Sequence, residues 1–338
     1  MTWNSLTLLK VLGLYYLASI HLFLHATAAT IAATDVFTSL SVQSQGTALI
    51  ASGAYQATLT FDIKPSMAGD NFILTMPDVY SINTDLKTIT VTNPDDSSQV
   101  LLTCDTIDGA YIVNFSELQC TVGDNISTEY TGSLNFVFTF SVGGSASDLE
   151  LEQAIKMTAG PFEINWDGLT SNVTLPGVDS EPSYDSVYSY IHSTKYGTLE
   201  EYYLLPSCEG ESTNGDFTIT FNGGAANSID CDSVTVGVAG IFNSWYLPEE
   251  NNENEAVGFT CDASTSTIYY TIYILDPGYR PYLTVFQYLE SSSVASTNKF
   301  VTSLTCGSSV AFTNTENYQI VLESLPNDET ASPLAVST

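Results

Sequence analysis

The chain has 338 residues, and its 38 acidic side chains outnumber its 7 basic ones to give a formal net charge of −31. Such a charge repels phosphate backbones and anionic headgroups, which excludes nucleic acids and anionic membrane surfaces as partners. Hydrophobic residues make up 44% of the chain and aromatic residues 12%, which excludes a disordered protein and is enough for two domain cores.

The N-terminal segment, residues 1–28, is predicted to be a cleaved signal peptide. One basic residue, Lys10, precedes an apolar run that ends at Leu24, and Ala-Thr-Ala at positions 26–28 matches an A-x-A cleavage site. The run is too short and too poorly flanked for a membrane span, so we expect no membrane insertion of the mature domains. Cleavage would remove one positive charge and leave a secreted chain.

The rest of the chain is predicted to be almost entirely β. Alternating apolar and polar residues predict a first set of strands at residues 54–63, 71–76, 88–91 and 133–142. A short helical turn is expected at residues 147–155, where Asp148 and Glu150 suit a helix N-terminus. A polar stretch with Pro and Gly at residues 176–183 suits a domain boundary. A second set of strands follows at residues 216–221, 233–238, 268–275, 282–289 and 319–324.

Six cysteines lie outside the leader, at Cys104, Cys120, Cys208, Cys231, Cys261 and Cys306. In an oxidising compartment they are expected to form disulfides, although spacing alone does not choose among the pairings. Three N-x-S/T triplets predict glycosylation at Asn114, Asn125 and Asn172. These features are typical of an extracellular glycoprotein.

Motifs for catalysis and cofactors are absent from the sequence, so we expect no enzyme, no cofactor, no metal and no catalytic residues. There is no C-x-x-C, phosphate-binding glycine loop, H-E-x-x-H or G-x-S-x-G. His192, the one histidine outside the leader, has no triad pattern around it and is interpreted as structural or as a surface residue. The acids at positions 249–255 are interpreted as a charged turn in preference to a calcium site, and the tyrosines at 184–203 as core packing in preference to interface anchors.

Five blocks of sequence resemble the yeast agglutinins and agglutinin-like adhesins. The first, G-D-N-F-I-L-T-M-P at residues 69–77, resembles the family's G-D-x-F-x-L-x-M-P segment. The others resemble family segments in the same order and with similar spacing: residues 151–160, 229–233 (I-D-C-D-S), 243–248 (N-S-W-Y-L-P) and 277–282 (P-G-Y-R-P-Y). The resemblance covers about residues 30–315.

The resemblance implies two immunoglobulin-like β-sandwiches in tandem, which we expect at residues 29–176 and 177–326, followed by a polar tail at 327–338. It also implies the disulfides Cys104–Cys120, Cys208–Cys306 and Cys231–Cys261. A further disulfide of the agglutinin-like adhesins aligns with Asp78 and Lys156, so both of its cysteines are missing here, as they are in the sexual agglutinin. We expect these two side chains to lie close together and form an ion pair.

Function is expected from the same resemblance. The agglutinin-like adhesins bind extended C-terminal peptides in a cleft between the two domains, where a lysine pairs with the peptide carboxylate, and the resemblance implies the same mode here. Counting back without gaps from Met76, that lysine aligns with Lys64, which directly follows a predicted strand; a solvated lysine at a strand end is the alternative. Arg280 is expected to be structural or to lie at the rim of the site.

The sequence therefore predicts a cell-adhesion module of a secreted or cell-wall fungal glycoprotein. Its expected partners are cell-surface proteins or peptides of a host or mating partner cell. Two alternatives remain open: a sexual agglutinin-type receptor that uses an open surface of the second domain, and a lectin-like or glycosidase β-sandwich. The sequence ends without a hydrophobic anchor signal, so a fragment of a longer protein and a released product are both compatible with it.

Overall fold

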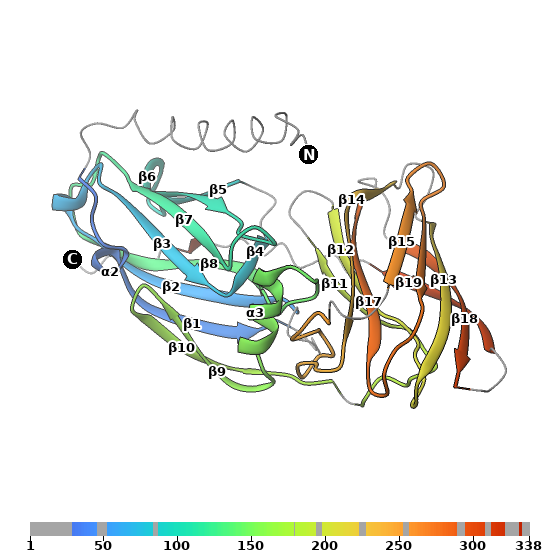
Figure 1. Ribbon diagram of the computed structural model, residues 1–338. Coiled ribbons are helices and arrows are strands. Elements are labelled where there is room, and N and C mark those ends of the chain that lie inside the picture. The colour runs from blue at the N-terminus through green and yellow to red at the C-terminus, as the bar shows by residue number, and fades with distance from the viewer. Residues whose placement is uncertain are drawn as a thin grey trace, which may run out of the picture.

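The computed structural model describes the chain from residue 29 onward, with gaps. The described segments are residues 29–45, 53–83, 87–178, 180–193, 198–222, 228–252, 257–288, 295–307, 312–321 and 331–332. Strands dominate them and form two β-sandwiches that lie side by side (Figure 1). The predicted signal peptide lies outside the described residues. No helix within the described segments is long and apolar enough to cross a membrane.

The first sandwich consists of two antiparallel sheets and a hairpin. One sheet has the order β1-β2-β8-β20, with β4 also paired to β8, and contains β1 (Phe37–Ser44), β2 (Tyr55–Ile63), β4 (Val79–Asn83), β8 (Tyr130–Phe140) and β20 (Ala331–Ser332). The other has the order β3-β7-β6-β5 and contains β3 (Asn71–Pro77), β5 (Thr88–Asn93), β6 (Asp96–Ile107) and β7 (Phe115–Val122). The hairpin of β9 (Gly160–Trp166) and β10 (Leu169–Leu175) lies beside β1, where Val42 N donates to Ser171 Oγ at 3.1 Å.

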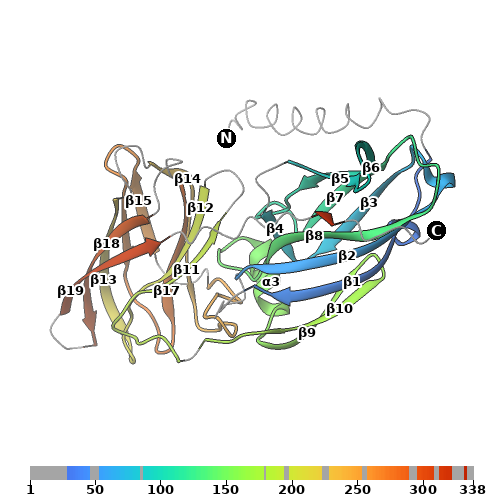
Figure 2. The ribbon, with the colours of Figure 1, turned by 180° about the vertical axis from the view of Figure 1, so that it is seen from behind.

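The second sandwich has the same two-layer plan. Its first sheet has the order β11-β12-β17-β14, formed by β11 (Tyr188–Ser193), β12 (Thr198–Leu204), β14 (Ser228–Ala239) and β17 (Arg280–Tyr288). Its second has the order β15-β16-β13-β18-β19, formed by β13 (Ser212–Asn222), β15 (Val257–Asp262), β16 (Thr267–Ile272), β18 (Ala295–Cys306) and β19 (Phe312–Val321). Figure 2 shows the same arrangement of the two sandwiches from behind.

The cores follow from alternation along the strands, because successive side chains point to opposite faces of a sheet. Along β2 every second residue, from Tyr55 to Ile63, is fully buried and packs in the first core. Phe217, Ile219 and Phe221 of β13 do the same in the second core. The period-2 pattern in the sequence is therefore the direct cause of both sandwiches.

Most predicted elements are confirmed, with small differences at their ends. The expected helical turn is α3 (Asp148–Lys156), whose N-cap Ser147 accepts a hydrogen bond from Glu150 N and whose first turn carries two acids. Strand β16 ends at Ile272, earlier than predicted, and the predicted strand end at 322–324 lies outside the described residues. The all-β prediction of two immunoglobulin-like sandwiches is confirmed.

Three disulfides join the six cysteines in the pairs that the family resemblance implies. Cys104–Cys120 links the neighbouring strands β6 and β7, and Cys208–Cys306 links the segment before β13 to the end of β18. Cys231–Cys261 joins β14 to β15 and so connects the two sheets of the second sandwich. The asparagines of the three glycosylation triplets, Asn114, Asn125 and Asn172, are all exposed.

Loop length predicts different contributions from the disulfides to stability. Replacing Cys208 and Cys306 by Ala is expected to lower the free energy of unfolding of the second sandwich by about 4.7 kcal/mol, because 98 residues separate them. Replacing Cys104 and Cys120, separated by 16 residues, is expected to cost the first sandwich about 3 kcal/mol. Urea unfolding followed by circular dichroism measures both losses. A larger loss for the short loop would contradict the chain-entropy origin of the effect.

Candidate ligand-binding site

The two sandwiches meet through a shared apolar core. Trp245 and Leu247, from the loop between β14 and β15, are fully buried in the same cluster as Val142 and Phe140 of the first sandwich. Tyr202 and Tyr282 of the second sandwich belong to this cluster too. The Trp245 Nε1 donates a hydrogen bond to the carbonyl of Pro176 at 2.6 Å, so the polar atom of the indole is satisfied inside the contact.

Asn243 organises the loop that carries Trp245. Its Oδ1 accepts hydrogen bonds from the backbone N–H groups of Trp245 at 3.0 Å and Leu247 at 3.1 Å. Its Nδ2 donates across the junction to the carbonyl of Val142 at 3.1 Å. Ser244 Oγ also accepts from the backbone of Ala159 at 3.1 Å. The N-S-W-Y-L-P block of the sequence is therefore the clasp between the sandwiches.

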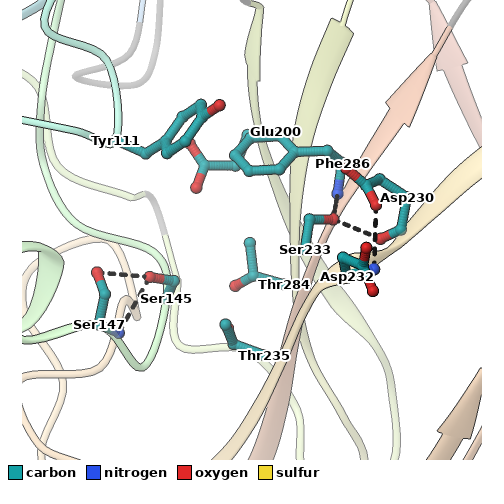
Figure 3. Close-up of a pocket in the computed structure, with 10 residues that line it drawn as sticks. All are labelled: Tyr111, Ser145, Ser147, Glu200, Asp230, Asp232, Ser233, Thr235, Thr284 and Phe286. Atoms are coloured by element: carbon teal, nitrogen blue, oxygen red, sulfur yellow. Dashed lines mark hydrogen bonds between the residues drawn. The ribbon is translucent and has the colours of Figure 1, made fainter. Parts of the chain in front are cut away.

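A pocket of about 350 Å³ opens at this junction and is lined from both sides (Figure 3). The first sandwich contributes Tyr111, Ser145 and Ser147, and the second contributes Glu200, Asp230, Asp232, Ser233, Thr235, Thr284 and Phe286. The rings of Tyr111 and Phe286 are in contact across the junction, with centroids 4.5 Å apart. Tyr111 and Asp232 are exposed, so the pocket is accessible from solvent.

Behind the pocket lies a buried polar cluster that also crosses the junction. Tyr80 of β4 donates a hydrogen bond to Glu200 Oε2 of β12 at 2.5 Å, and its ring stacks on His192 with centroids 4.3 Å apart. Glu150 of α3 interacts electrostatically with Glu200, and the side chains of Tyr80, His192, Glu200 and Glu150 are all at most 5% exposed. Because strand residues alternate, the neighbouring Glu201 points into the second core instead, where it accepts from Tyr203 and Asn298.

Burial decides the protonation of this cluster. Desolvation, together with the charge of Glu200, raises the pKa of the Glu150 carboxyl, and desolvation also raises the pKa of Glu200. Desolvation lowers the pKa of His192 to about 4, so its imidazole is neutral near pH 7 and its 3.7 Å contact with Glu200 is no ion pair. Burial therefore favours the neutral, protonated form of both carboxyls.

The turn before α3 brings Glu150 into place. Gly143 and Gly144 have φ values of +92° and +144°, which side-chain-bearing residues rarely adopt. A Cβ on Gly143 would lie 2.7 Å from the Ala154 Cβ, so α3 packs directly on this backbone. The carbonyl of Gly144 accepts a hydrogen bond from Thr284 Oγ1 of β17. The Gly-Gly turn thus sets the close approach of α3 to the second sandwich.

Lys64 lies far from this junction. It follows β2, whose last residue Ile63 pairs with Tyr130 at the start of β8, whereas the junction lies beyond Phe140 at the end of β8. Ten residues of strand separate the two ends, or roughly 30 Å. The half-exposed Lys64 contacts Asp62 at 3.6 Å. The expectation that Lys64 occupies an inter-domain cleft is therefore corrected, because β2 runs away from the second sandwich.

Arg280 is a structural residue of the second sandwich. It is 4% exposed, and its guanidinium donates to the carbonyls of Pro182, Ser186 and Leu205 while it covers the Tyr184 ring at 5.3 Å. It thereby ties the inter-domain segment to β17. The structure does not bring Arg280 and Lys64 together.

The expected ion pair between Asp78 and Lys156 is confirmed. Lys156 Nζ lies 2.6 Å from Asp78 Oδ1, with the lysine side chain half exposed and the aspartate largely buried. The pair joins the start of β4 to the end of α3. It therefore fixes the elements that carry Tyr80 and Glu150, the polar residues of the junction.

The remaining candidate residues from the sequence have structural roles or lie partly outside the described residues. His192 is buried, as are Tyr190, Tyr202 and Tyr203 of the tyrosine-rich stretch. Part of the acidic run at 249–255 lies outside the described residues, and within it Glu250 Oε1 accepts from Gly240 N at 3.0 Å. In the segments that the structure describes, no three His, Cys, Asp or Glu side chains are grouped to hold a metal ion.

The sequence interpretation missed the pocket itself. Its residues come from segments up to 175 positions apart, from Tyr111 to Phe286, and no local motif joins them. One signal was available, because Asp230 and Asp232 lie within the I-D-C-D-S block that resembles the family. An acidic block next to a disulfide cysteine marks a surface turn, but it does not reveal which surface faces it.

Comparisons with known proteins give one consistent result. The model of the family described as "Agglutinin-like protein, N-terminal domain" matches residues 60–306. Agglutinin-like protein 5 of Candida albicans is 27% identical over 224 residues, covering 64% of this chain and 16% of that protein. Alpha-agglutinin of Saccharomyces cerevisiae is 30% identical over 219 residues, covering 62% and 33%. The chain thus spans no more than a third of the length of these two relatives.

Two solved structures align with most of the chain. The serine-rich repeat protein Srr2 of Streptococcus agalactiae aligns with a TM-score of 0.47 and 14% identity, covering 86% of this chain and 96% of that one. The collagen adhesin of S. aureus aligns with a TM-score of 0.40 and 13% identity, covering 87% and 98%.

The buried carboxyl pair predicts a pH dependence. The pKa of Glu150 is raised to about 8, so the stability that its protonated form contributes is complete below the ordinary carboxyl range and is lost as the pH rises toward 8. Glu150→Gln keeps the N–H donor toward Glu200 without titrating. We expect the variant to gain stability relative to the wild type by on the order of 1–2 kcal/mol between pH 5 and pH 9.

Urea unfolding at several pH values measures this difference. His192 is present in both proteins. Its protonation at low pH lowers the free energy of unfolding of both, so this contribution largely cancels in the difference between them. Glu163→Gln, at an exposed position of β9, is the matched control and should follow the wild type at every pH. Parallel pH curves for the wild type and Glu150→Gln would show that Glu150 is not the titrating group.

Proposed function

Because the chain belongs to the agglutinin-like family, whose model matches residues 60–306, we propose that it is a non-enzymatic adhesion module of a fungal cell-surface protein. In this proposal the module binds a protein or peptide on another cell through the pocket at the junction of the two sandwiches. The domains that we propose for it are residues 29–176 and 177–326, with the inter-domain segment tied down by Arg280.

The observation that carries the proposal is the pocket between the sandwiches. Its walls combine an aromatic pair with hydroxyl and carboxylate groups, a mixture that suits a polar peptide better than an apolar molecule. The clasp formed by Asn243 and Trp245 holds the two walls in register without a ligand. Little ordering energy is then lost on binding, because the site is already formed.

A second candidate surface lies on the outer face of the second sandwich. Tyr269 of β16 and Tyr273, which directly follows that strand, are 50% and 56% exposed. Exposed tyrosines suit an open protein-binding surface. This observation favours the receptor-type alternative, in which the pocket is not the contact site.

Adhesion of beads coated with the full chain to yeast cells of a partner strain tests the proposal. Thr235→Trp places an indole in the pocket and is expected to reduce bead attachment at least tenfold, since a blocked pocket cannot admit the ligand. Thr315→Trp, an equal change at an exposed position of β19, is the control and should adhere like the wild type.

Two further comparisons separate the alternatives. Loss of attachment in Tyr269→Ala/Tyr273→Ala, with Thr235→Trp unaffected, would move the site to the outer face of β16. Attachment that survives protease treatment of the target cells but not periodate oxidation of their glycans would replace the protein ligand by a carbohydrate. Attachment by neither the wild type nor any variant would count against an adhesion function.

A further inference from the structure

The ionisable side chains with a carboxyl or a basic group that line the junction pocket are all acids. Glu200, Asp230 and Asp232 line it, and none of the described lining residues is basic. The chain has very few cations to offset them: Lys156 is paired with Asp78, and Arg280 is held by backbone carbonyls.

The hydrogen bonds of these acids come from neutral groups. Asp230 Oδ2 accepts from the Tyr288 hydroxyl at 3.2 Å, and Asp230 Oδ1 accepts from the backbone of Asp232 at 3.0 Å. Glu200 Oε2 accepts from the Tyr80 hydroxyl. Neutral donors orient a carboxylate but leave its charge uncompensated, so the pocket keeps a net attraction for a positive group.

One other feature of the walls suits the same kind of group. The rings of Tyr111 and Phe286 lie together at the pocket, and the faces of aromatic rings attract ammonium and guanidinium ions.

We propose that the pocket binds a cationic group of the partner, an ammonium or guanidinium, between the carboxylates of Asp230 and Asp232 and the rings of Tyr111 and Phe286. This inference rests on the proposed function and names its ligand chemistry. A peptide carboxylate would face three acids at this place and no base, so the anchor of the ligand is its positive charge. A lysine or arginine side chain and a free N-terminal amine both supply that charge.

Four pentapeptides of equal length distinguish these sources. They are Ac-GSKGS-NH₂ with a lysine side chain, GSGGS-NH₂ with a free N-terminal amine, Ac-GSGGS-NH₂ without charge, and Ac-GSEGS with an acidic side chain and a free C-terminal carboxylate. Each is titrated into the isotope-labelled full chain, and amide shifts in the NMR spectrum report the dissociation constant. At least one cationic peptide is expected to bind ten times more tightly than the uncharged one.

The carboxylates are tested by Asp230→Asn/Asp232→Asn, which keeps a side-chain oxygen at position 230 to accept the hydrogen bond of the Asx turn. We expect at least a tenfold loss of affinity for the cationic peptide. The control Asp96→Asn/Asp262→Asn changes the net charge by the same amount in two turns of the same kind, where Asp96 and Asp262 accept from Ser98 N and Ser264 N. It should bind like the wild type, and the single change Asp232→Asn at an exposed position guards against misfolding.

Equal or tighter binding of the uncharged or the acidic peptide would overturn the inference, as would an equal loss in the control pair or binding of none of the four peptides. The bead adhesion assay distinguishes failure of the cationic-ligand inference from failure of the proposed adhesion function. Adhesion that Thr235→Trp abolishes but Asp230→Asn/Asp232→Asn leaves intact would keep the pocket as the site and reject the cationic ligand.

Discussion

The contact between the loop at Trp245 and the end of β8 is the constraint on which the rest of the structure depends. A buried tryptophan removes a large apolar area from water, and here it does so at the boundary of two sandwiches. Its neighbours Asn243 and Ser244 satisfy backbone groups on both sides of that boundary. Apolar burial supplies the attraction and the hydrogen bonds supply the register, so the two sandwiches present one fixed surface.

Fixing the junction in this way forces polar groups into the interior. Glu150 and Glu200 approach each other from different sandwiches, and neither has a cation beside it to balance its charge. Because separating a carboxylate from water is costly, burial raises the pKa of both carboxyls and favours their protonated forms, and it lowers the pKa of His192 for the same reason. The cluster therefore makes the contact between the sandwiches specific, since a shifted junction would leave these groups without partners.

The sequence predicts individual strands and helix ends, but it does not predict the pocket, which forms only when two sandwiches pack together. Alternation in segments such as Tyr55–Ile63 is visible in one sequence because each strand buries one face, and Ser147 with Asp148 and Glu150 marks the start of α3. The Asp78–Lys156 pair was predictable because both positions changed together relative to the resembled family. The position of Lys64 was predicted wrongly. Counting along the chain shows that Lys64 follows a strand, but it does not show whether that strand ends near the second sandwich or at the opposite end of the first. The pocket needs the register between two sandwiches, which no local pattern encodes.

The acidic composition of the chain and the acidic pocket both favour positively charged partners, one at long range and the other at short range. A formal net charge of −31 attracts any cationic surface at long range and repels anionic ones, but salt screens such attraction beyond about 10 Å. Selection of one partner therefore requires a place where opposite charges meet at short range with part of their water removed. The junction offers such a place, because the Glu200 carboxyl at its wall is 5% exposed and the Tyr111–Phe286 pair lies at the same pocket. A partner that brings only general positive charge would gain the long-range attraction, whereas one that also fits a single cationic group between the rings and the carboxylates would gain the proposed short-range contact.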